Sequence, residues 1–508
     1  MKKQLAGILA LAMSLSMAAC SSNSDSGEAP ANETTITVAA VKDETTAKAD
    51  DGDSKAEKEE ETTTEATTEA TTAETEPPVP EIKYVDAPAE DFEYSYDAAL
   101  KGVRVTAYNG SEEAIRIPAE IDGDPVKALT LSGKNAKYIE YVFPDGTETI
   151  EEGTLSGSGV TSVVIPDSVT GIGDYAFKGC TRLTNITIPG SVKTIGGGAF
   201  LDCSALTSVV IPDSITELLP ADADKYQAFD HDGTFAGCTK LTYVKLPDTL
   251  KTIGLGTFKG CESLKSITIP SSVTDIGGGA FSGCSGLANI TLPDGIKIGS
   301  SVFAGCESLT EISIPDNAEF YYDNYFYAFD NRHNMHYENS LYGTFYGCTS
   351  LTNVKLPKTV KTIDSGAFYE CTSLKEITIP DGVVSIGSGV FYNCYELTDI
   401  TIPDSLKFVG KEAFTNCVKL RSLDLPSGAE MFGNYAFSGC EALTVTNNGA
   451  EYNYTNFSDL YNVIDTVYMV NVGDLGYEIY GCSETNQYYI PALDMYMDIK
   501  TMNKSLAF

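Results

Sequence analysis

Cysteine is the residue type whose spacing in this sequence most directly suggests chemistry. Eleven of the 13 cysteines follow one another at steps of 22 or 23 residues, apart from two longer steps of 35 and 42. These residues are Cys180, Cys203, Cys238, Cys261, Cys284, Cys306, Cys348, Cys371, Cys394, Cys417 and Cys440. Neighbouring repeats could bring some of them within disulfide-bridging range, as in other exported proteins. The fixed place in the repeat favours instead one inward-facing, reduced thiol per repeat, packed as a small apolar residue.

Metal-binding chemistry has weak support in the sequence. The close CxxC pairs of a zinc site are absent. All three histidines, His231, His333 and His336, lie near carboxylates, but no third or fourth ligand follows at a recognisable spacing. The stretch Asp222–Asp224 lacks the glycine and the distal glutamate of an EF-hand. We therefore expect solvated loop histidines, with no metal and no cofactor.

Catalytic motifs are also absent from the sequence. It contains no GxSxG, no P-loop and no HExxH. Carboxylates are abundant, so some will lie close together by chance. We expect the protein not to be an enzyme.

Two aromatic-rich insertions carry the best candidates for ligand binding. They lie near residues 219–232 and 319–342, and lengthen the repeat by 12 and 19 residues. The candidate residues are Tyr226, Phe229, His231, Tyr321, Tyr322, Tyr325, Tyr327, Phe329, His333, His336 and Tyr337. Because both insertions enter the repeat at the same place, we expect them to project from one face, about 20 Å apart. Their rings could bind a partner or fold back over the repeat beneath.

The scaffold is a 23-residue phrase, of which Leu264 to Gly286 is one copy. Ile267 and Ile269 lie two apart and so share one face of a short strand, which Pro270 ends because it has no amide hydrogen. A single copy cannot bury its apolar face, whereas stacked copies can. The phrase predicts a mainly β solenoid of about 13 coils, with short parallel strands and 3₁₀-like turns.

The pattern L-T-x-I-x-I-P-x-x-V-x-x-I-G-x-x-A-F-x-x-C resembles the treponemal-type leucine-rich repeat of BspA-like bacterial surface proteins. The match covers roughly residues 92–442. The resemblance implies a curved leucine-rich-repeat solenoid at the cell surface, used for adhesion or for binding host proteins. It brings no catalytic residue.

The N-terminal segment has the features of an exported, lipid-anchored protein. Residues 1–19 read as a lipoprotein signal peptide, and Met17–Cys20 resembles a lipobox with Cys20 as the lipidated residue. An ordinary signal peptide with a chance cysteine is the alternative. Residues 20–82 have the Thr-, Glu- and Pro-rich composition of a disordered tether. We expect an extracytoplasmic location, with lipid chains as the only membrane contact.

Three further segments complete the expected organisation. Residues 83–136 alternate polar and apolar residues and predict an N-terminal β cap. The solenoid would occupy residues 137–442. Residues 443–508 are interpreted as a degenerate coil with a third insertion, closed by Cys482, and a C-terminal cap. A separate small element is the alternative for the final stretch.

The charge of the chain narrows its possible partners. A formal net charge of −37 should repel nucleic acid and anionic lipid surfaces. We expect non-catalytic binding of an extracellular protein. Two alternatives remain, namely glycan capture for polysaccharide scavenging and a structural spacer without a specific ligand. Binding to soluble glycans would favour the first, and complete packing of the insertion aromatics would favour the second.

Overall fold

The structure is a computed structural model that describes residues 82–98, 101–129, 136–220, 233–321, 343–363 and 365–461, and four short stretches beyond them, 463–472, 475–482, 487–490 and 495–498. The chain divides into two compact units, Met1–Thr75 and Glu76–Phe508, and every described residue belongs to the second. The expected signal peptide, Cys20 and nearly all of the tether lie outside the described residues. Within the described part, no helix is long and apolar enough to cross a membrane.

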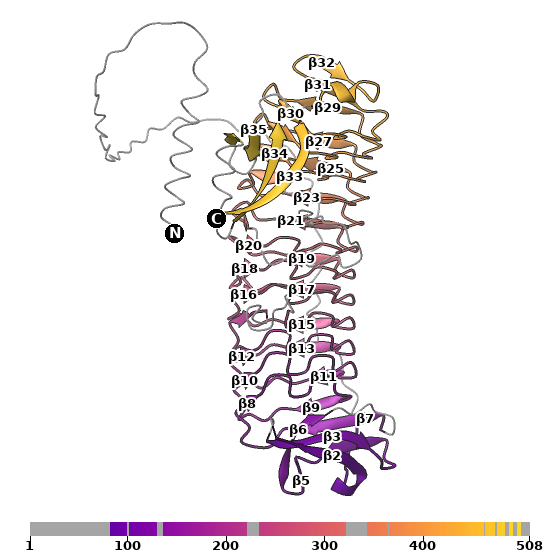
Figure 1. Cartoon of the computed structure of the whole chain (residues 1–508), viewed down its shortest axis with the longest axis vertical. Helices are drawn as coiled ribbons and strands as arrows, with labels where there is room; N and C mark the ends of the chain where they lie inside the picture. Colours follow the sequence, from indigo (N-terminus) through magenta and orange to yellow (C-terminus); the bar gives the residue numbers. More distant parts are fainter. Residues whose placement is uncertain are drawn as a thin grey trace, which may run out of the picture. The chain divides into compact units, whose positions relative to one another are not determined.

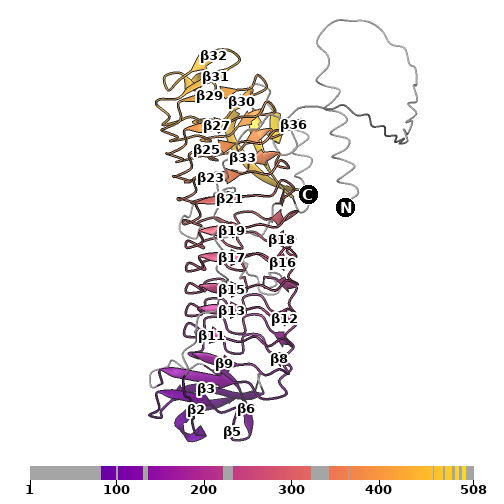
Figure 2. The same ribbon diagram turned by 180° about the vertical axis from the view of Figure 1, so that it is seen from behind.

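Each coil but the last contains two short strands joined by turns, and the coils stack in chain order (Figures 1 and 2). The first strands are β7 (Tyr138–Val142), β9 (Ser162–Val164), β11 (Asn185–Ile186), β13 (Ser208–Val210), β15 (Tyr243–Lys245), β17 (Ser266–Thr268), β19 (Asn289–Thr291), β21 (Glu311–Ser313), β23 (Asn353–Lys355), β25 (Glu376–Thr378), β27 (Asp399–Thr401), β29 (Ser422–Leu425) and β31 (Thr444–Asn447). The second strands are β8 (Thr149–Ile150), β10 (Gly171–Ile172), β12 (Thr194–Ile195), β14 (Glu217–Leu218), β16 (Thr252–Ile253), β18 (Asp275–Ile276), β20 (Lys297–Ile298), β22 (Glu319–Phe320), β24 (Thr362–Ile363), β26 (Ser385–Ile386), β28 (Phe408–Val409) and β30 (Met431–Phe432).

The predicted parallel solenoid of about 13 coils with a period near 23 is confirmed. Ile267 of β17 pairs in register with Ile290 of β19 and is buried, while the flanking Thr268 is exposed. The turns are closed by bonds between residues three apart, such as Cys284 N to Phe281 O at 3.1 Å. This is the spacing of a 3₁₀ turn.

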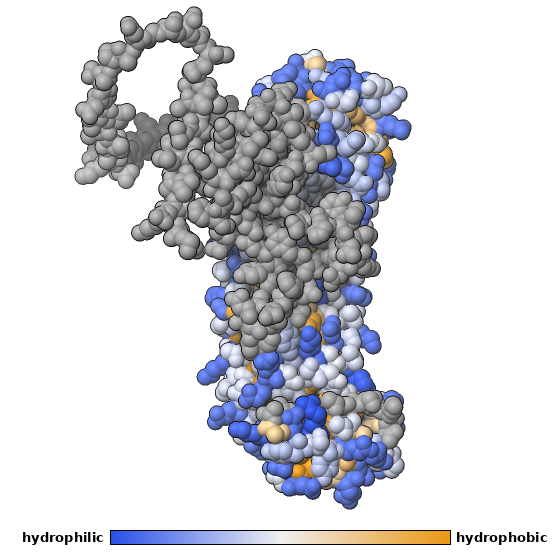
Figure 3. All heavy atoms as spheres, in the orientation of Figure 1, coloured by the Kyte–Doolittle hydropathy of each residue, from blue (hydrophilic) through white to orange (hydrophobic). Residues whose placement is uncertain are grey.

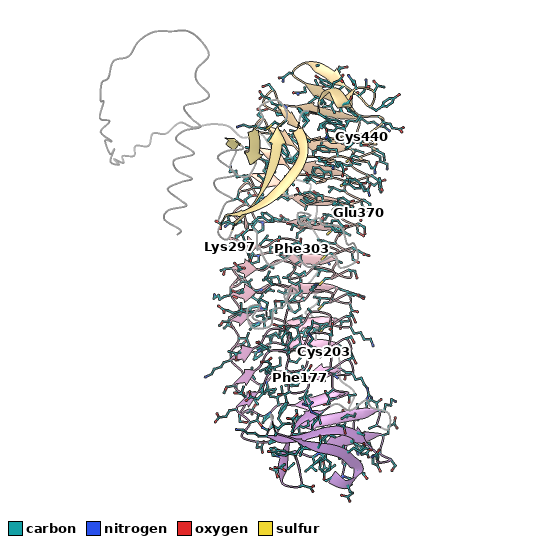
Figure 4. The ribbon with its side chains drawn as sticks, viewed as in Figure 1. Phe177, Cys203, Lys297, Phe303, Glu370 and Cys440 are labelled. Carbon is teal, nitrogen blue, oxygen red and sulfur yellow. The ribbon has the colours of Figure 1, made fainter. Side chains whose placement is uncertain are left out.

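Phenylalanine and cysteine form two internal ladders. Consecutive phenylalanine rings from Phe177 to Phe437 stack nearly parallel, with ring centroids 5.1 to 6.0 Å apart. Each thiol donates to a carbonyl of the preceding coil, as Cys284 Sγ does to Phe258 O at 3.1 Å. Figure 4 labels members of both ladders, from Phe177 and Cys203 to Cys440.

The prediction of reduced, buried thiols is confirmed for the eleven ladder cysteines. Burial raises the pKa of the Cys284 and Cys348 thiols to about 12. The thiolate is therefore strongly disfavoured, and thiols of this kind are chemically inert.

The N-terminal end is capped by a small sheet and by one short strand. β2 (Phe92–Asp97), β3 (Gly102–Tyr108), β6 (Asp124–Leu129) and β5 (Glu120–Ile121) form a four-stranded sheet. β4 (Ala114–Ile117) already stacks as a coil strand on β7, and β1 (Val85–Asp86), followed by the 3₁₀ turn η1 (Ala89–Asp91), pairs with its outer edge. The cap thus covers most of the open strand edge that the first coil would otherwise expose.

The C-terminal end differs from the interpretation of the sequence. η2 (Phe457–Asp459) places Phe457 against Phe437, with ring centroids 5.3 Å apart, and Leu460 is buried three residues later. These two residues take the Phe and Cys places of the phrase, so the last coil closes there and not at Cys482. β32 (Ala450–Tyr452) pairs antiparallel with β31.

Cys482 lies instead in a separate antiparallel sheet. This sheet contains β33 (Val463–Val472), β34 (Leu475–Cys482), β35 (Gln487–Ile490) and β36 (Met495–Asp498). Cys482 pairs with Val463 of β33. A separate element was considered only for the final stretch from Met495, of which β36 is the described part, and not for residues 463–490.

Candidate functional site

Both insertions leave the coils at the same point, directly after a second strand. The first follows β14 and the second follows β22. β14 and β22 are the two edges of one five-stranded parallel sheet, ordered β14-β16-β18-β20-β22. Four strand steps therefore separate the two exits, or about 19 Å.

Both exits lack the glycine that most coils have after the second strand; Glu151 after β8 and Asp364 after β24 are the other exceptions. A Cβ at Gly277 would lie 2.6 Å from the Leu255 amide nitrogen of the preceding coil. No side chain fits at Gly277 while these two coils keep their spacing. At the two exits the same position holds Leu219 and Tyr321. The chain thus gains a side chain at the position where it departs from the regular path.

Three regular coils form a floor between the exits. The residues that begin the second strands of these three coils and of the two insertion-bearing coils are Glu217, Thr252, Asp275, Lys297 and Glu319. Lys297 Nζ lies 3.9 Å from Glu319 Oε2, and Figure 4 shows Lys297 at the edge of the stack that carries these strands. We call these five residues the inter-insertion floor. It combines one lysine with three carboxylates.

Tyr321 is the one predicted binding residue that lies within the described part of the chain. Its hydroxyl donates to Asp275 Oδ1 at 2.8 Å and lies 3.4 Å from Ile276 O. Its amide donates to Ile298 O at 3.0 Å, which continues the backbone ladder. The half-buried side chain therefore reaches back across one full coil and packs onto the floor.

Asp275 is held in a partly buried position by this contact. Burial raises the pKa of the Asp275 carboxyl above its ordinary value, while the Tyr321 hydrogen bond and the charge of Lys297 act in the opposite direction. The net shift is upward. The Tyr321 hydroxyl thus partly stabilises a carboxylate that the coil desolvates.

The other predicted binding residues lie outside the described residues. They are Tyr226, Phe229, His231, Tyr322, Tyr325, Tyr327, Phe329, His333, His336 and Tyr337. Their binding role remains a prediction. Over the part of the chain that the structure describes, no group of three or more His, Cys, Asp or Glu side chains could hold a metal ion.

A tyrosine stack beyond the second insertion was not anticipated from the sequence. The rings of Tyr346, Tyr369 and Tyr392 stack with centroids 5.1 and 4.6 Å apart. Burial, and then the neighbouring Tyr392 and Glu370, raise the pKa of Tyr369. Mutual stacking covers the ring faces inside the stack, so it suits bracing of the coils better than docking of a ligand. The Phe-Tyr word repeated every 23 residues is the sequence signal for it.

A cavity of about 370 Å³ lies between the cap and the first coils. Its lining includes Arg116, Pro118 and Pro144. Arg116 already binds Asp86 at 2.9 Å and Glu140 at 2.7 Å, so its charge is engaged within the protein. The cavity is a weaker candidate than the inter-insertion floor.

The fold and these features define a leucine-rich-repeat binding scaffold. A family model described as the BspA type leucine rich repeat region matches six copies within residues 132–221, 231–342 and 341–463. The matches cover more than half of the chain, which therefore belongs to the BspA-type leucine-rich-repeat family. The resemblance found in the sequence is confirmed.

The chain was also compared with solved structures. The chain is similar to a leucine-rich repeat protein from Bacteroides ovatus, with 27% identity, a TM-score of 0.53, and coverage of 73% of this chain and 89% of that one. A leucine-rich cell surface protein from Faecalibacterium prausnitzii gives 24% identity, a TM-score of 0.41, and coverage of 75% and 98%. The T. pallidum leucine-rich repeat protein gives 20% identity, a TM-score of 0.20, and coverage of 66% of this chain and 91% of that one. No curated protein matches the chain.

Proposed function

We propose that the protein binds an extracellular protein partner without catalysis, through the two insertions and the inter-insertion floor. The carrying observation is that the insertions directly follow β14 and β22, the two outer strands of one parallel sheet, with three regular coils between them. Coils held by continuous Phe and Cys ladders keep the two exits at a fixed separation. A rigid scaffold with loops at a fixed distance suits recognition of a surface larger than either loop.

The residues of the insertions suit such a role. Tyrosine offers broad amphipathic contact at low conformational cost, and aromatic residues are enriched at protein interfaces. Tyr321 supplies the anchor by which the second insertion begins on the floor, through its bond to Asp275. The family is a leucine-rich-repeat scaffold, and no catalytic family is indicated.

The proposal includes display outside the cytoplasmic membrane. The lipobox-like Met17–Cys20 and the composition of residues 20–82 support a lipid anchor at Cys20 followed by a tether. The net charge of −37 argues against nucleic acid as a partner.

The test uses residues 83–508 and a second version with both insertions trimmed to regular coil length. Both are measured against an array of matrix proteins and glycans, with circular dichroism as the check on folding. The proposal expects the first version to bind a protein and the trimmed version to fold without binding. Equal binding of a protein partner by both versions would refute it.

The alternatives predict different outcomes in the same assay. The glycan alternative predicts binding to soluble glycans in the absence of any protein hit. The spacer alternative predicts that neither version binds, and the packing of Tyr321 onto Asp275 is the observation that favours it.

A further inference from the structure

The outer face of the first strands from β9 to β19 carries no acidic side chain. Outward positions alternate with the buried ones along each strand. Over these six coils they hold Ser162, Val164, Asn185, Thr187, Ser208, Val210, Tyr243, Lys245, Ser266, Thr268, Asn289 and Thr291. We call this set the neutral strip. One lysine is its only charge, although the chain has 71 Asp and Glu residues.

The repeat itself does not require this neutrality. At the equivalent outward positions of the later first strands, the chain places Glu311, Glu376, Asp399 and Asp424. Glu376 and Asp399 are direct partners in the register of β25 and β27. The same scaffold therefore accepts carboxylates on this face, and their absence from β9 to β19 is a local property.

Tyr243 provides an aromatic platform within the strip. It pairs in register with Ser208 of the preceding coil. Ser208 is only 3% exposed, whereas Ser162 and Ser266 at the same position are half-buried. Tyr243 is the large side chain beside it and is itself only partly buried, so part of this side chain is open to the solvent.

The strip around Tyr243 is lined mainly by small side chains. Val164 is 44% exposed, and Thr268, Asn289 and Thr291 are exposed. The strands pair without register shifts from β13 to β15 and from β17 to β19. In Figure 3 the described surface is mainly hydrophilic, with apolar residues in small separate spots. Hydroxyl and amide groups thus recur on both sides of Tyr243 at one coil step, about 4.8 Å.

This chemistry selects among classes of ligand. A protein interface would have a larger apolar core than one tyrosine and two valines. An anionic polymer would be repelled by the net charge of the chain. A neutral sugar polymer offers hydroxyl groups to Ser, Thr and Asn, and the apolar face of a sugar ring packs on an aromatic ring. An extended linear glycan also advances by about one coil step per sugar, so its hydroxyl groups recur at about the spacing of the polar side chains.

We propose that the neutral strip binds a neutral linear polysaccharide, with Tyr243 as the stacking platform. The strip spans five strand steps, about 24 Å, which is enough for about five sugar residues. Its strands belong to two sheets, β9 to β15 in one and β17 to β19 in the other, and neither sheet contains the inter-insertion floor. The strip also selects a different class of ligand. The proposal is therefore independent of the function proposed above.

The test is affinity electrophoresis of the full chain through gels that contain a neutral β-glucan, xylan or mannan, with polygalacturonate as the charged comparison. Titration with the corresponding hexasaccharides gives the affinities. We expect retardation by at least one neutral polymer and none by polygalacturonate. Tyr243→Ala should weaken the affinity about tenfold, while Tyr395→Ala, at an exposed tyrosine outside the strip, should leave it unchanged.

A second variant keeps the test decisive if Tyr243→Ala unfolds. Asn289→Asp replaces one exposed side-chain amide of the strip with a carboxylate. It should weaken binding of the glycan without a shift in Tm. Trimming both insertions should leave glycan binding intact. Absence of neutral-glycan binding at millimolar hexasaccharide would overturn the proposal. Equal glycan binding by the wild type and the strip variants would also overturn it. Loss of glycan binding when the two insertions are trimmed and the strip is left unchanged would overturn it as well.

Discussion

Replacement of Gly277 by alanine tests how tightly neighbouring coils pack at the insertion position. The added Cβ would lie 2.6 Å from Leu255 N, 2.8 Å from Gly254 C and 3.1 Å from Leu255 Cα. All three atoms belong to the backbone of the preceding coil, so no side chain can rotate to make room. Ordinary contact needs about 3.4 Å or more, so the two coils must separate locally by about 0.8 Å. Overpacking of this kind costs about 1–3 kcal/mol.

Gly190→Ala is the matched control for this prediction. A Cβ at Gly190 has no heavy atom within 4 Å, and Gly190 is not among the glycines with positive φ. It should be neutral, or stabilising by up to about 1 kcal/mol, because it restricts only the unfolded chain. The assay is urea denaturation of both variants, together with hydrogen exchange of the amides in β16 and β18. Equal stabilities would refute the steric account of the exits. The account also requires that the amides of β16 and β18 exchange faster than in the wild type for Gly277→Ala, and at the wild-type rate for Gly190→Ala.

Three further predictions concern the ladders and the floor. Phe281→Ala should lower the free energy of unfolding by about 3–5 kcal/mol, because the ring is fully buried between Phe258 and Phe303, with ring centroids 5.6 and 6.0 Å away. Denaturant titration measures this loss of stability. A loss below about 1 kcal/mol would contradict a continuous core. Tyr321→Phe removes a hydrogen bond that lowers the pKa of Asp275, so the pKa of this carboxyl should rise further. The folded variant then holds the proton more tightly than the unfolded chain does. The stability of the variant should therefore fall more than that of the wild type as pH rises above the ordinary value of 3.8. A difference between variant and wild type that does not vary between pH 3 and pH 7 would argue against the assignment. The eleven ladder thiols should resist a thiol reagent in the native protein and react in denaturant; rapid native reaction of several of them would show that the ladder opens.

The repeat was predictable because each of its positions has one physical task. The Ile-x-Ile-Pro stretch specifies a short strand with one buried face, and the Phe-x-x-Cys stretch specifies the buried turn. Even the irregular first coil follows this logic. Leu155 and Ser158 take the Phe and Cys places, both are buried, and Ser158 Oγ lies 3.3 Å from Cys180 Sγ.

The C-terminal boundary was not predictable from the same pattern. Spacing and a cysteine suggested that Cys482 closes a long coil. The last coil instead closes after a shorter step, with Phe457 and Leu460, because leucine fills the apolar place of cysteine equally well. A search for a single residue type overlooks a substitution that keeps the packing.

The repeat pattern also did not predict that some outward-facing residues of the second strands are buried. Phe408 and Met431 occupy the outward position that holds Asp275 and Lys297 in other coils, yet they are 0% and 4% exposed. The repeat defines what lies inside each coil and says nothing of what covers its outside. For the same reason, the sequence predicts where the two insertions begin but could not show that Tyr321 bonds to Asp275.

The most direct test of the central claim is the affinity of a protein partner for four versions of the chain. These are the wild type, each single trim of an insertion to regular coil length, and the double trim. The account predicts that each single trim weakens binding and that the double trim abolishes it, because both loops contact one partner across the inter-insertion floor. Undiminished binding by the double trim would contradict it.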